Sequence, residues 1–280
     1  MMNKREHPRF NIFFGAKRQE CRVTSAQTWR IMDKYEQTVK TWKAWKVRTV
    51  ADLDLRLDSF RILFAFNSGK IENPEVTFHD TREIFENGKI AGFSGNPRTL
   101  FEQQNQKTCY AFLCDKIVSR ETLNIALIKE VHRALTEGTY DEKRYIVNGE
   151  RPGEFKKHDY VTGVNEVGSY PEEVDQDMTE LIDEVNSIGA KDPLKAGAYF
   201  HARFENIHPF ADGNGRVGRT LLNYRLMIND YPPTIIFDED KGVYYSALQR
   251  FDEDENINTL VGFIREQTVK TWTRVMRLTE

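Results

Sequence analysis

The residues best suited to chemistry lie in one short stretch, residues 208–219, which read HPFADGNGRVGR. The stretch holds a histidine that can exchange a proton near neutral pH, a carboxylate that suits a hard divalent cation, and two arginines whose planar donor groups bind anions. A glycine-rich turn lies between the carboxylate and the arginines. A base, a cation ligand, a turn and two cations so close together indicate phosphate chemistry.

Helices are predicted on both sides of this stretch. Asp192 and Pro193 are typical of a helix start, and apolar residues recur at helical spacing from there to Ile207. A second helical period follows over residues 216–229 and ends before the sequence YPP. The glycine turn therefore leads into the start of a helix, where free backbone N–H groups and the positive end of the helix dipole bind anions.

Two other phosphate-loop patterns match the stretch in part. Gly213, Gly215 and Gly218 satisfy GxGxxG, and residues 213–220 differ from the P-loop pattern GxxxxGK[ST] by Arg219, which stands where lysine belongs. Both patterns require a β-strand directly before the loop. The preceding segment is predicted to be helical, which disfavours both interpretations.

The complete stretch resembles the signature of the Fic family, HxFx[DE]GNGRxxR, with every fixed position present. We call residues 208–219 the catalytic stretch. Members of that family are mostly adenylyltransferases, which move AMP from ATP to a hydroxyl side chain of a target protein. The resemblance implies the same activity here, with ATP as co-substrate, Mg²⁺ as cofactor, and Tyr, Thr or Ser hydroxyls of other proteins or of this chain as acceptors. It also implies an all-α fold, a Fic-type helical bundle with one short β-hairpin flap.

Two residues of the stretch are expected to carry the reaction. In the family the histidine takes a proton from the attacking hydroxyl, and His208 stands at its position, with an ordinary pKa of about 6.5 that suits a general base. Asp212 is a hard oxygen ligand suited to Mg²⁺, which bridges phosphate oxygens and neutralises charge during the displacement. We therefore expect His208 to be the catalytic base and Asp212 the metal ligand.

The remaining polar residues are expected to hold the phosphates of ATP. The backbone N–H groups of Gly213, Asn214 and Gly215 lie at the predicted helix start. Arg216 and Arg219 are three positions apart on one helical face, so both side chains can reach the distal phosphates. The role of the Asn214 side chain stays open between a contact with the α-phosphate and the supply of a left-handed turn.

A second motif lies in the N-terminal third of the chain. Apolar residues at helical spacing predict a helix over residues 53–64 that continues toward Asn73 and ends before Pro74. Residues 68–73, SGKIEN, match [ST]xxxE[GN], which resembles the inhibitory motif of Fic proteins that carry their own inhibitor ahead of the catalytic stretch. We call residues 68–73 the inhibitory motif. The alternative interpretation is a helix end with a solvated glutamate.

The expected mechanism of the inhibitory motif is electrostatic competition. Glu72 paired with Arg219 occupies the cation that the γ-phosphate of ATP needs, so ATP binds only in a non-productive pose. Ser68 lies four residues before Glu72 and shares its helical face, which lets Ser68 help to hold the pair.

Two further segments are expected to bind the target and the nucleotide base. Between residues 149 and 171 the helical period is lost, and turn residues bracket Tyr160, Val161 and Thr162, which predicts a short β-hairpin. In Fic proteins such a hairpin, the flap, binds the extended segment of the target through backbone hydrogen bonds. Further along, the sequence KGVYYSALQ resembles the adenine-side segment of the family. Its Tyr244 and Tyr245 are candidates to contact adenine, with buried core tyrosines as the equal alternative.

The composition is that of an ordinary soluble protein. The 280 residues are 39% hydrophobic and 30% charged with a net charge of −3, so no electrostatic attraction to nucleic acid or to an acidic membrane is expected. Cys21, Cys109 and Cys114 fit neither a disulfide framework nor a zinc site, and the N-terminal apolar piece FNIFFGA is too short for a signal peptide or a membrane span. We expect a cytoplasmic protein that binds neither nucleic acid nor membrane; homo-oligomerisation stays open.

The chain is expected to have two parts, an N-terminal helical region with the inhibitory motif at residues 1–90 and a Fic catalytic domain at residues 91–280. Within the second part, helices are predicted at residues 100–114, 121–136, 172–188, 195–207, 216–229, 244–250 and 257–274.

The leading functional hypothesis is an autoinhibited protein adenylyltransferase. One alternative is the removal of AMP from a modified protein, with Glu72 orienting a water. Another is a binding or regulatory module without catalysis, against which an intact His208 and Asp212 argue. Transfer of phosphate is disfavoured, because Fic relatives with that activity carry lysine where this chain has Gly215.

Overall fold

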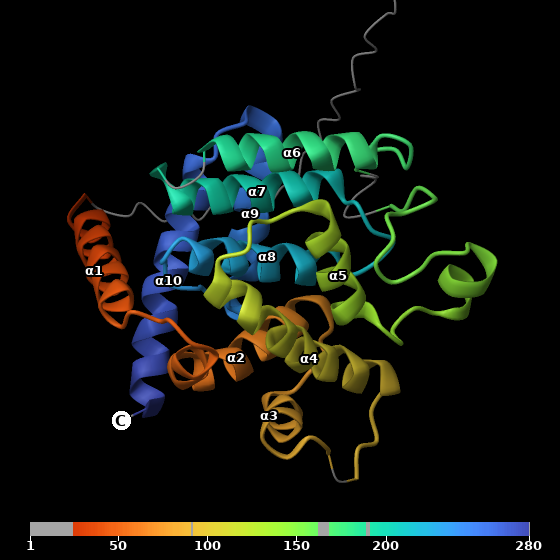
Figure 1. Cartoon of the computed structure of the whole chain (residues 1–280), viewed down its shortest axis with the longest axis horizontal. Helices are drawn as coiled ribbons and strands as arrows, with labels where there is room; N and C mark the ends of the chain where they lie inside the picture. Colours follow the sequence, from red (N-terminus) through yellow and green to blue (C-terminus); the bar gives the residue numbers. More distant parts are fainter. Residues whose placement is uncertain (1–24, 91, 162–167, 189–190, 280) are drawn as a thin grey trace, which may run out of the picture.

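The computed structural model describes residues 25–90, 92–161, 168–188 and 191–279. Over these ranges the chain forms helices and loops and contains no β-strand, so the predicted all-α class is confirmed. The helices form one bundle in which α8 runs through the middle, with α6 and α7 on one side and α2 and α4 on the other (Figure 1).

The centre of the bundle is the helix pair α7 (Pro193–Ile207) and α8 (Asn214–Ile228). The Asp192 side chain caps the first turn of α7, as its position before Pro193 predicts. Only residues 208–213 connect the two helices. The first half of the catalytic stretch is therefore a tight turn between two packed helices.

The other helices of the predicted catalytic domain surround this pair. All seven predicted helices are present, with ends that differ from the predicted ones by a few residues. Besides α7 and α8 they are α4 (Pro97–Ser119), α5 (Ile125–Thr136), α6 (Val174–Ile188), α9 (Lys241–Asp254) and α10 (Asn258–Thr279).

Helix α4 is longer than the apolar period predicted. Its first half buries polar side chains, which face neighbouring helices and interrupt the apolar pattern; they are Glu102, Gln103, Asn105 and Gln106. Asn96 caps the helix by accepting the Arg98 N–H at 3.0 Å. The start of α4 thus brings a polar surface into the interior, close to the catalytic stretch.

The N-terminal helices are α1 (Ser25–Ala44), α2 (Val50–Glu72) and α3 (Phe78–Asn87). Helix α1 lies along α10, where the rings of Trp42 and Trp272 meet edge to face with centroids 5.4 Å apart.

Helix α2 belongs to the predicted N-terminal region but packs against helices of the predicted catalytic domain. It begins at a capping box formed by Thr49 and Asp52. Its Leu53, Leu57 and Phe60 lie in the same buried cluster as side chains of α7 and α8, so the two predicted parts share one core. The boundary near residue 90 remains a prediction.

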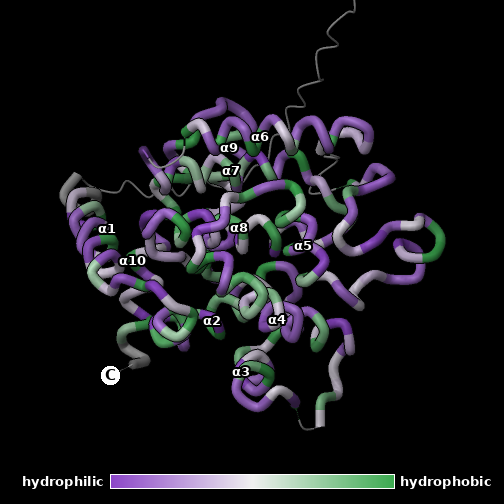
Figure 2. The backbone as a smooth tube through the Cα atoms, viewed as in Figure 1, coloured by the Kyte–Doolittle hydropathy of each residue, from purple (hydrophilic) through white to green (hydrophobic). Residues whose placement is uncertain are grey.

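The segment between α5 and α6 projects from the bundle. It contains a short π-helix, Lys143–Val147, at the right-hand edge of Figure 1. Figure 2 shows that the tip of this projection is hydrophobic, and Tyr145, Ile146 and Val147 are 45%, 71% and 74% exposed. Exposed apolar residues in a group are typical of a contact surface.

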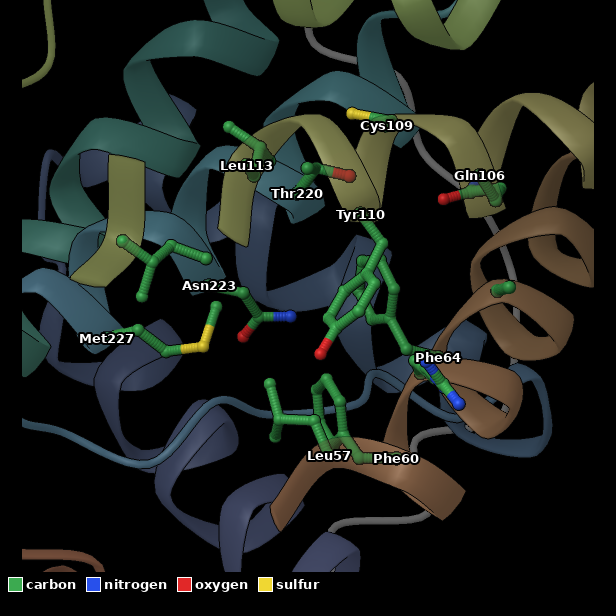
Figure 3. Close-up of a pocket in the computed structure, with 13 residues that line it drawn as sticks. Leu57, Phe60, Phe64, Gln106, Cys109, Tyr110, Leu113, Thr220, Asn223 and Met227 are labelled. Carbon is green, nitrogen blue, oxygen red and sulfur yellow. The ribbon is translucent and has the colours of Figure 1, made fainter. Parts of the chain in front are cut away.

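A small cleft of about 40 Å³, partly open to solvent, lies between α2, α4 and α8 (Figure 3). Its lining is mainly apolar, from Leu57 and Phe60 on one side to Leu113 on the other. Three residues that line the cleft have a buried polar atom without a hydrogen-bond partner among the described residues; the atoms are Arg61 Nε, Gln106 Nε2 and Thr220 Oγ1.

None of the described helices combines the length and the apolar character that a bilayer span requires.

Candidate active site

The catalytic stretch holds its shape through its own backbone and one side chain. His208 ends α7 in the left-handed conformation, with φ 51° and ψ 61°, and Gly213 precedes α8 with φ 81°. Between them, the amide of Asn214 donates to the Phe210 carbonyl at 2.7 Å and accepts the Phe210 N–H at 2.9 Å. The left-handed turn therefore belongs to His208 and Gly213, and the Asn214 side chain clamps the loop. A phosphate contact for Asn214 stays a prediction.

A buried histidine that the sequence reasoning missed supports the loop from behind. The ring of His132, on α5, stacks on the Phe210 ring with centroids 3.7 Å apart. Its Nδ1 accepts the Gly153 N–H at 2.8 Å, so the neutral ring carries its proton on Nε2 and donates to the Asp212 carbonyl at 3.0 Å. Burial lowers the pKa of His132 to about 3, which keeps it neutral. The only signal in the sequence was a histidine on the apolar face of a helix.

His208 lies in surroundings that keep it deprotonated. Burial and the nearby cation of Lys156 lower its pKa to about 4. At pH 7 the imidazole is therefore neutral and can accept a proton, as a general base must.

Asp212 lies among several arginines. Its Oδ2 accepts from Arg98 at 2.6 Å, its Oδ1 accepts the Gly213 N–H at 2.7 Å, and Arg216 is 3.7 Å away. Burial raises the pKa of the Asp212 carboxyl, but Arg216, Arg98 and Arg144 outweigh this and hold the pKa below its usual value. Asp212 is thus ionised, and it shares its arginines with two further carboxylates, Glu102 and Asp141.

Two of these arginines were missed by the sequence reasoning, because they lie far from the catalytic stretch along the chain. Arg98 comes from the start of α4 and Arg144 from the projection, where its Nε donates to the Ala211 carbonyl at 3.4 Å. Arg216 is 2% exposed, and its Nε has no hydrogen-bond partner among the described residues. Glu102 and Asp141 also pair with these arginines, but three guanidinium groups at one place and an unused buried donor on Arg216 suit a polyanion such as a triphosphate.

The residues present fit a magnesium ion only together with phosphate oxygens. Within the described ranges no group of three or more His, Cys, Asp or Glu side chains could hold a metal. Mg²⁺ in nucleotide sites, however, is commonly bound by one or two carboxylates, with phosphates and waters completing the octahedron. The Asp212 side chain, 20% exposed and ionised, meets that requirement.

The inhibitory motif reaches the same site from α2. Arg219, 2% exposed on α8, donates to Glu72 Oε1 at 2.8 Å, to Ser68 Oγ at 3.0 Å and to the Ser68 carbonyl at 2.9 Å. The Glu72 carboxylate also lies directly over Gly215: a Cβ built there would be 2.2 Å from Glu72 Oε1. The structure therefore brings Ser68, Glu72 and Arg219 together at the start of α8.

The two tyrosines of α9 differ in exposure. Tyr244 is 1% exposed, and its hydroxyl lies 2.7 Å from His201 Nε2, so it belongs to the core. Tyr245 is 47% exposed, and its ring centroid is 5.1 Å from that of Tyr244. Of the two candidates for the adenine contact, only Tyr245 presents an open face in this structure.

The predicted hairpin is not formed in the part of the flap that the structure describes. Residues 149–161 and 168–171 contain turns and loops without paired strands, and Thr162 lies outside the described residues. In the described residues the two arms bond on either side of His208: the Lys156 N–H donates to the Pro209 carbonyl at 2.9 Å, and the Ser169 N–H to the Ile207 carbonyl at the end of α7 at 2.9 Å.

The other predicted flap residues differ in their surroundings. The Tyr160 hydroxyl donates to Glu150 Oε1 at 3.0 Å and accepts from Asn148 Nδ2 at 3.0 Å, so it fixes the flap to its own base. Val161 is 69% exposed. Of these two residues, Val161 is the one free to contact another molecule.

Comparison of the chain with known proteins identifies a family match. Residues 122–226, which run from just before α5 into α8, match the model of the Fic/DOC family. This part of the chain, which includes residues 208–219, belongs to the Fic/DOC family. Over 208 residues the chain is 30% identical to the protein adenylyltransferase Fic of Drosophila willistoni, covering 74% of this chain and 40% of that protein. Over 210 residues it is 28% identical to protein adenylyltransferase fic-1 of Caenorhabditis briggsae, covering 72% and 38%.

The chain thus spans about 40% of the length of these curated relatives. Among solved structures, a Fic domain-containing signalling protein from Bacteroides thetaiotaomicron has a TM-score of 0.73 at 25% identity, covering 86% of this chain and 94% of that chain. Fic-1 from C. elegans has a TM-score of 0.69 at 21% identity, covering 91% and 74%. Residues 91–280 are only about two thirds of this chain, so the structural likeness includes part of the N-terminal helices.

Proposed function

We propose that this chain is an autoinhibited protein adenylyltransferase, which transfers AMP from ATP to a hydroxyl side chain of a target protein. The observation that carries the proposal is the position of Glu72, which pairs with Arg219 at 2.8 Å and lies over Gly215 at the start of α8. A helix start beside a buried arginine is a place for a phosphate, and here a carboxylate from another helix takes it.

The chemistry follows from the groups around the catalytic stretch. The target hydroxyl attacks the α-phosphorus of ATP; a P–O bond forms, and the bond to the departing pyrophosphate breaks. Neutral His208 accepts the hydroxyl proton. Arg98, Arg144 and Arg216 place positive charge near the phosphates. Mg²⁺, when bound at Asp212, neutralises charge on phosphate oxygens.

The proposed partner is a protein that presents a Tyr, Thr or Ser hydroxyl. The flap arms are hydrogen-bonded on both sides of His208, so a target segment bound by the flap lies close to the His208 side chain. Both relatives compared above are named protein adenylyltransferases, which supports a protein target and ATP as co-substrate. Cys109 and Cys114 are buried free thiols, which supports a reducing compartment such as the cytoplasm.

Removal of AMP from a modified protein is the second candidate. The Glu72 side chain is 37% exposed beside the start of α8, so water can reach its carboxylate. A carboxylate there can orient a water for attack on the phosphorus of a bound AMP-protein. In that case Glu72 is required for activity instead of opposing it.

The deciding experiment is mass spectrometry of a lysate incubated with labelled ATP and the Glu72→Gly variant. The matched control is Glu72→Gly combined with His208→Ala. AMP on peptides only with the single variant supports adenylyl transfer. Release of AMP from a premodified protein by the wild type but not by Glu72→Gly supports the reverse reaction. If neither result is obtained, the remaining hypothesis is a binding module without catalysis.

A further inference from the structure

The metal carboxylate of the candidate site already has a cation bound to it. Arg98 Nη2 lies 2.6 Å from Asp212 Oδ2, and Arg98 Nε donates to Glu102 Oε1 at 2.9 Å. The Arg98 side chain is 34% exposed, whereas that of Glu102 is 5% exposed. Arg98 is therefore held at both ends of its guanidinium group, by one partly buried and one buried carboxylate.

Glu102 connects this arginine to the inhibitory motif. Its Oε2 accepts from the side-chain amide of Asn73 at 3.2 Å, and its Oε1 lies 3.3 Å from Arg216 Nη1. Asn73 is the last residue of the inhibitory motif, and its N–H caps α2 by donating to the Gly69 carbonyl at 2.8 Å. A chain of direct contacts thus runs from Asp212 through Arg98 and Glu102 to the end of α2.

We propose that Arg98 is a positioning residue for metal binding: it keeps Asp212 oriented and neutralised while Glu72 holds Arg219, and it must release Asp212 when a divalent ion binds. This inference rests on the function proposed above and adds a second, separate control of the same site.

The physical argument is competition for one oxygen. A guanidinium 2.6 Å from Asp212 Oδ2 occupies the position from which a metal would coordinate that atom, so the two cations exclude each other there. Release of Arg98 does not leave a buried charge unpaired, because Glu102 remains bonded to it. The exchange is therefore between two paired states, which suits a reversible switch.

The contact chain also predicts coupling between the metal and the inhibitory motif. Glu102 binds Arg98, Arg216 and Asn73 at once, so a shift of Arg98 changes the contacts that end α2, one residue after Glu72. Such coupling is reciprocal: if metal binding weakens the Glu72 contact, removal of Glu72 must strengthen metal binding.

The test is the Mn²⁺ requirement for binding a fluorescent, non-hydrolysable ATP analogue to the full chain. In Arg98→Gln we expect the half-saturating Mn²⁺ concentration to fall about tenfold, the usual size of one coupled contact. Arg98→Lys keeps a cation and should stay within about threefold of the wild type. Arg120→Gln is the matched control, because Arg120 also pairs with an aspartate, Asp230, at 2.7 Å on the surface; it should not change the requirement.

Two further variants separate the outcomes. Asp212→Asn should abolish the Mn²⁺ requirement, and Glu72→Gly should lower it and shrink the additional effect of Arg98→Gln. If the half-saturating Mn²⁺ concentration is unchanged in Arg98→Gln, the inference is overturned while the proposed function stands. The same holds if the variant binds the analogue more weakly with no shift in that concentration. Equal effects of Arg98→Gln with and without Glu72 overturn the coupling. If Glu72→Gly binds no analogue at any Mn²⁺ concentration, the proposed function fails and the inference fails with it.

Discussion

The two sides of the candidate active site differ in whether any of their hydrogen bonds are local. On one side, the catalytic stretch makes hydrogen bonds within itself, through Asn214 to Phe210 and through Gly213 to Asp212, besides those that it receives from other segments. On the other side, Glu72 and Ser68 of the inhibitory motif contact Arg219, from which they are separated by 147 and 151 positions along the chain.

The difference shows how inhibition can be separated from chemistry. A locally bonded loop keeps its geometry when a neighbour moves, whereas a contact from another helix can be released without disturbing the loop. Changes on the catalytic side should therefore abolish the reaction, and changes on the inhibitory side should release it.

The largest effect is expected at the base. In the Glu72→Gly background, His208→Ala should lower the transfer rate about 10²- to 10⁴-fold, the range for a positioned general base, and leave nucleotide affinity nearly unchanged. Single-turnover transfer of labelled AMP and analogue binding measure the two quantities. A variant that bound no nucleotide would show that His208 is structural instead.

The inhibitory contact should give the next effect, with opposite signs at its two ends. Glu72→Gly should raise self-modification by about 10- to 100-fold, since a hydrogen bond to a charged group contributes about 1.5–3 kcal/mol. Arg219→Ala breaks the same pair but also removes the cation that the γ-phosphate needs, so it should stay inactive. Equal low activity in wild type and both variants, at saturating Mg²⁺ and ATP, would exclude the inhibitory role.

His132 tests whether the catalytic stretch depends on support from outside. His132→Ala should lower the free energy of unfolding by about 3 kcal/mol, because it leaves a cavity beside Phe210 and removes the hydrogen-bond partner of two partly buried backbone groups. His132→Phe keeps the stacking and should lose less. Urea unfolding measures both. A loss below about 0.5 kcal/mol in His132→Ala would mean that the stretch holds its shape unaided.

Acid should weaken the whole bundle because its interior histidines are neutral. Folding lowers the pKa of His132 and His201 to about 3 and of His208 to about 4, so below pH 6.5 the unfolded chain binds more protons at these sites. Glu205 acts in the opposite direction, because burial raises its pKa to about 7. The net difference averages about 1.4 protons between pH 6.5 and 5.5, so the free energy of unfolding should fall by about 2 kcal/mol over this interval.

Denaturant unfolding at several pH values checks this slope, and Glu205→Gln, which removes the opposing group, should steepen it. A flat profile over this range would contradict the neutral interior.

The smallest effect is expected at the cleft behind the inhibitory contact. Thr220 Oγ1 lies there without a described hydrogen-bond partner (Figure 3). Thr220→Val keeps the shape and removes an unpaired hydroxyl, so it should raise the free energy of unfolding by up to about 1 kcal/mol. Thermal unfolding measures it, with Thr273→Val on the exposed side of α10 as the neutral control. A destabilised Thr220→Val would show that water satisfies the hydroxyl.

The sequence alone predicted the features that depend on residues close together along the chain. The helix ends at Asp192 and Asn73 follow from caps and breakers that act within one turn. The catalytic stretch is contiguous, so its histidine, carboxylate and glycine turn were recognisable without any fold. Even the pairing of Glu72 with Arg219 came from a motif resemblance, not from anything in the sequence that measures distance.

Only the tertiary structure decided what bonds across helices. Arg98 meets Asp212 from 114 positions away, and His132 meets it from 80, because α4 and α5 pack against the turn between α7 and α8. The described flap arms bond to Ile207 and Pro209, on either side of His208, for the same reason. Backbone propensity and capping act over a few residues, whereas ion pairs and buried polar contacts form wherever packing brings their partners together, and no local pattern records that.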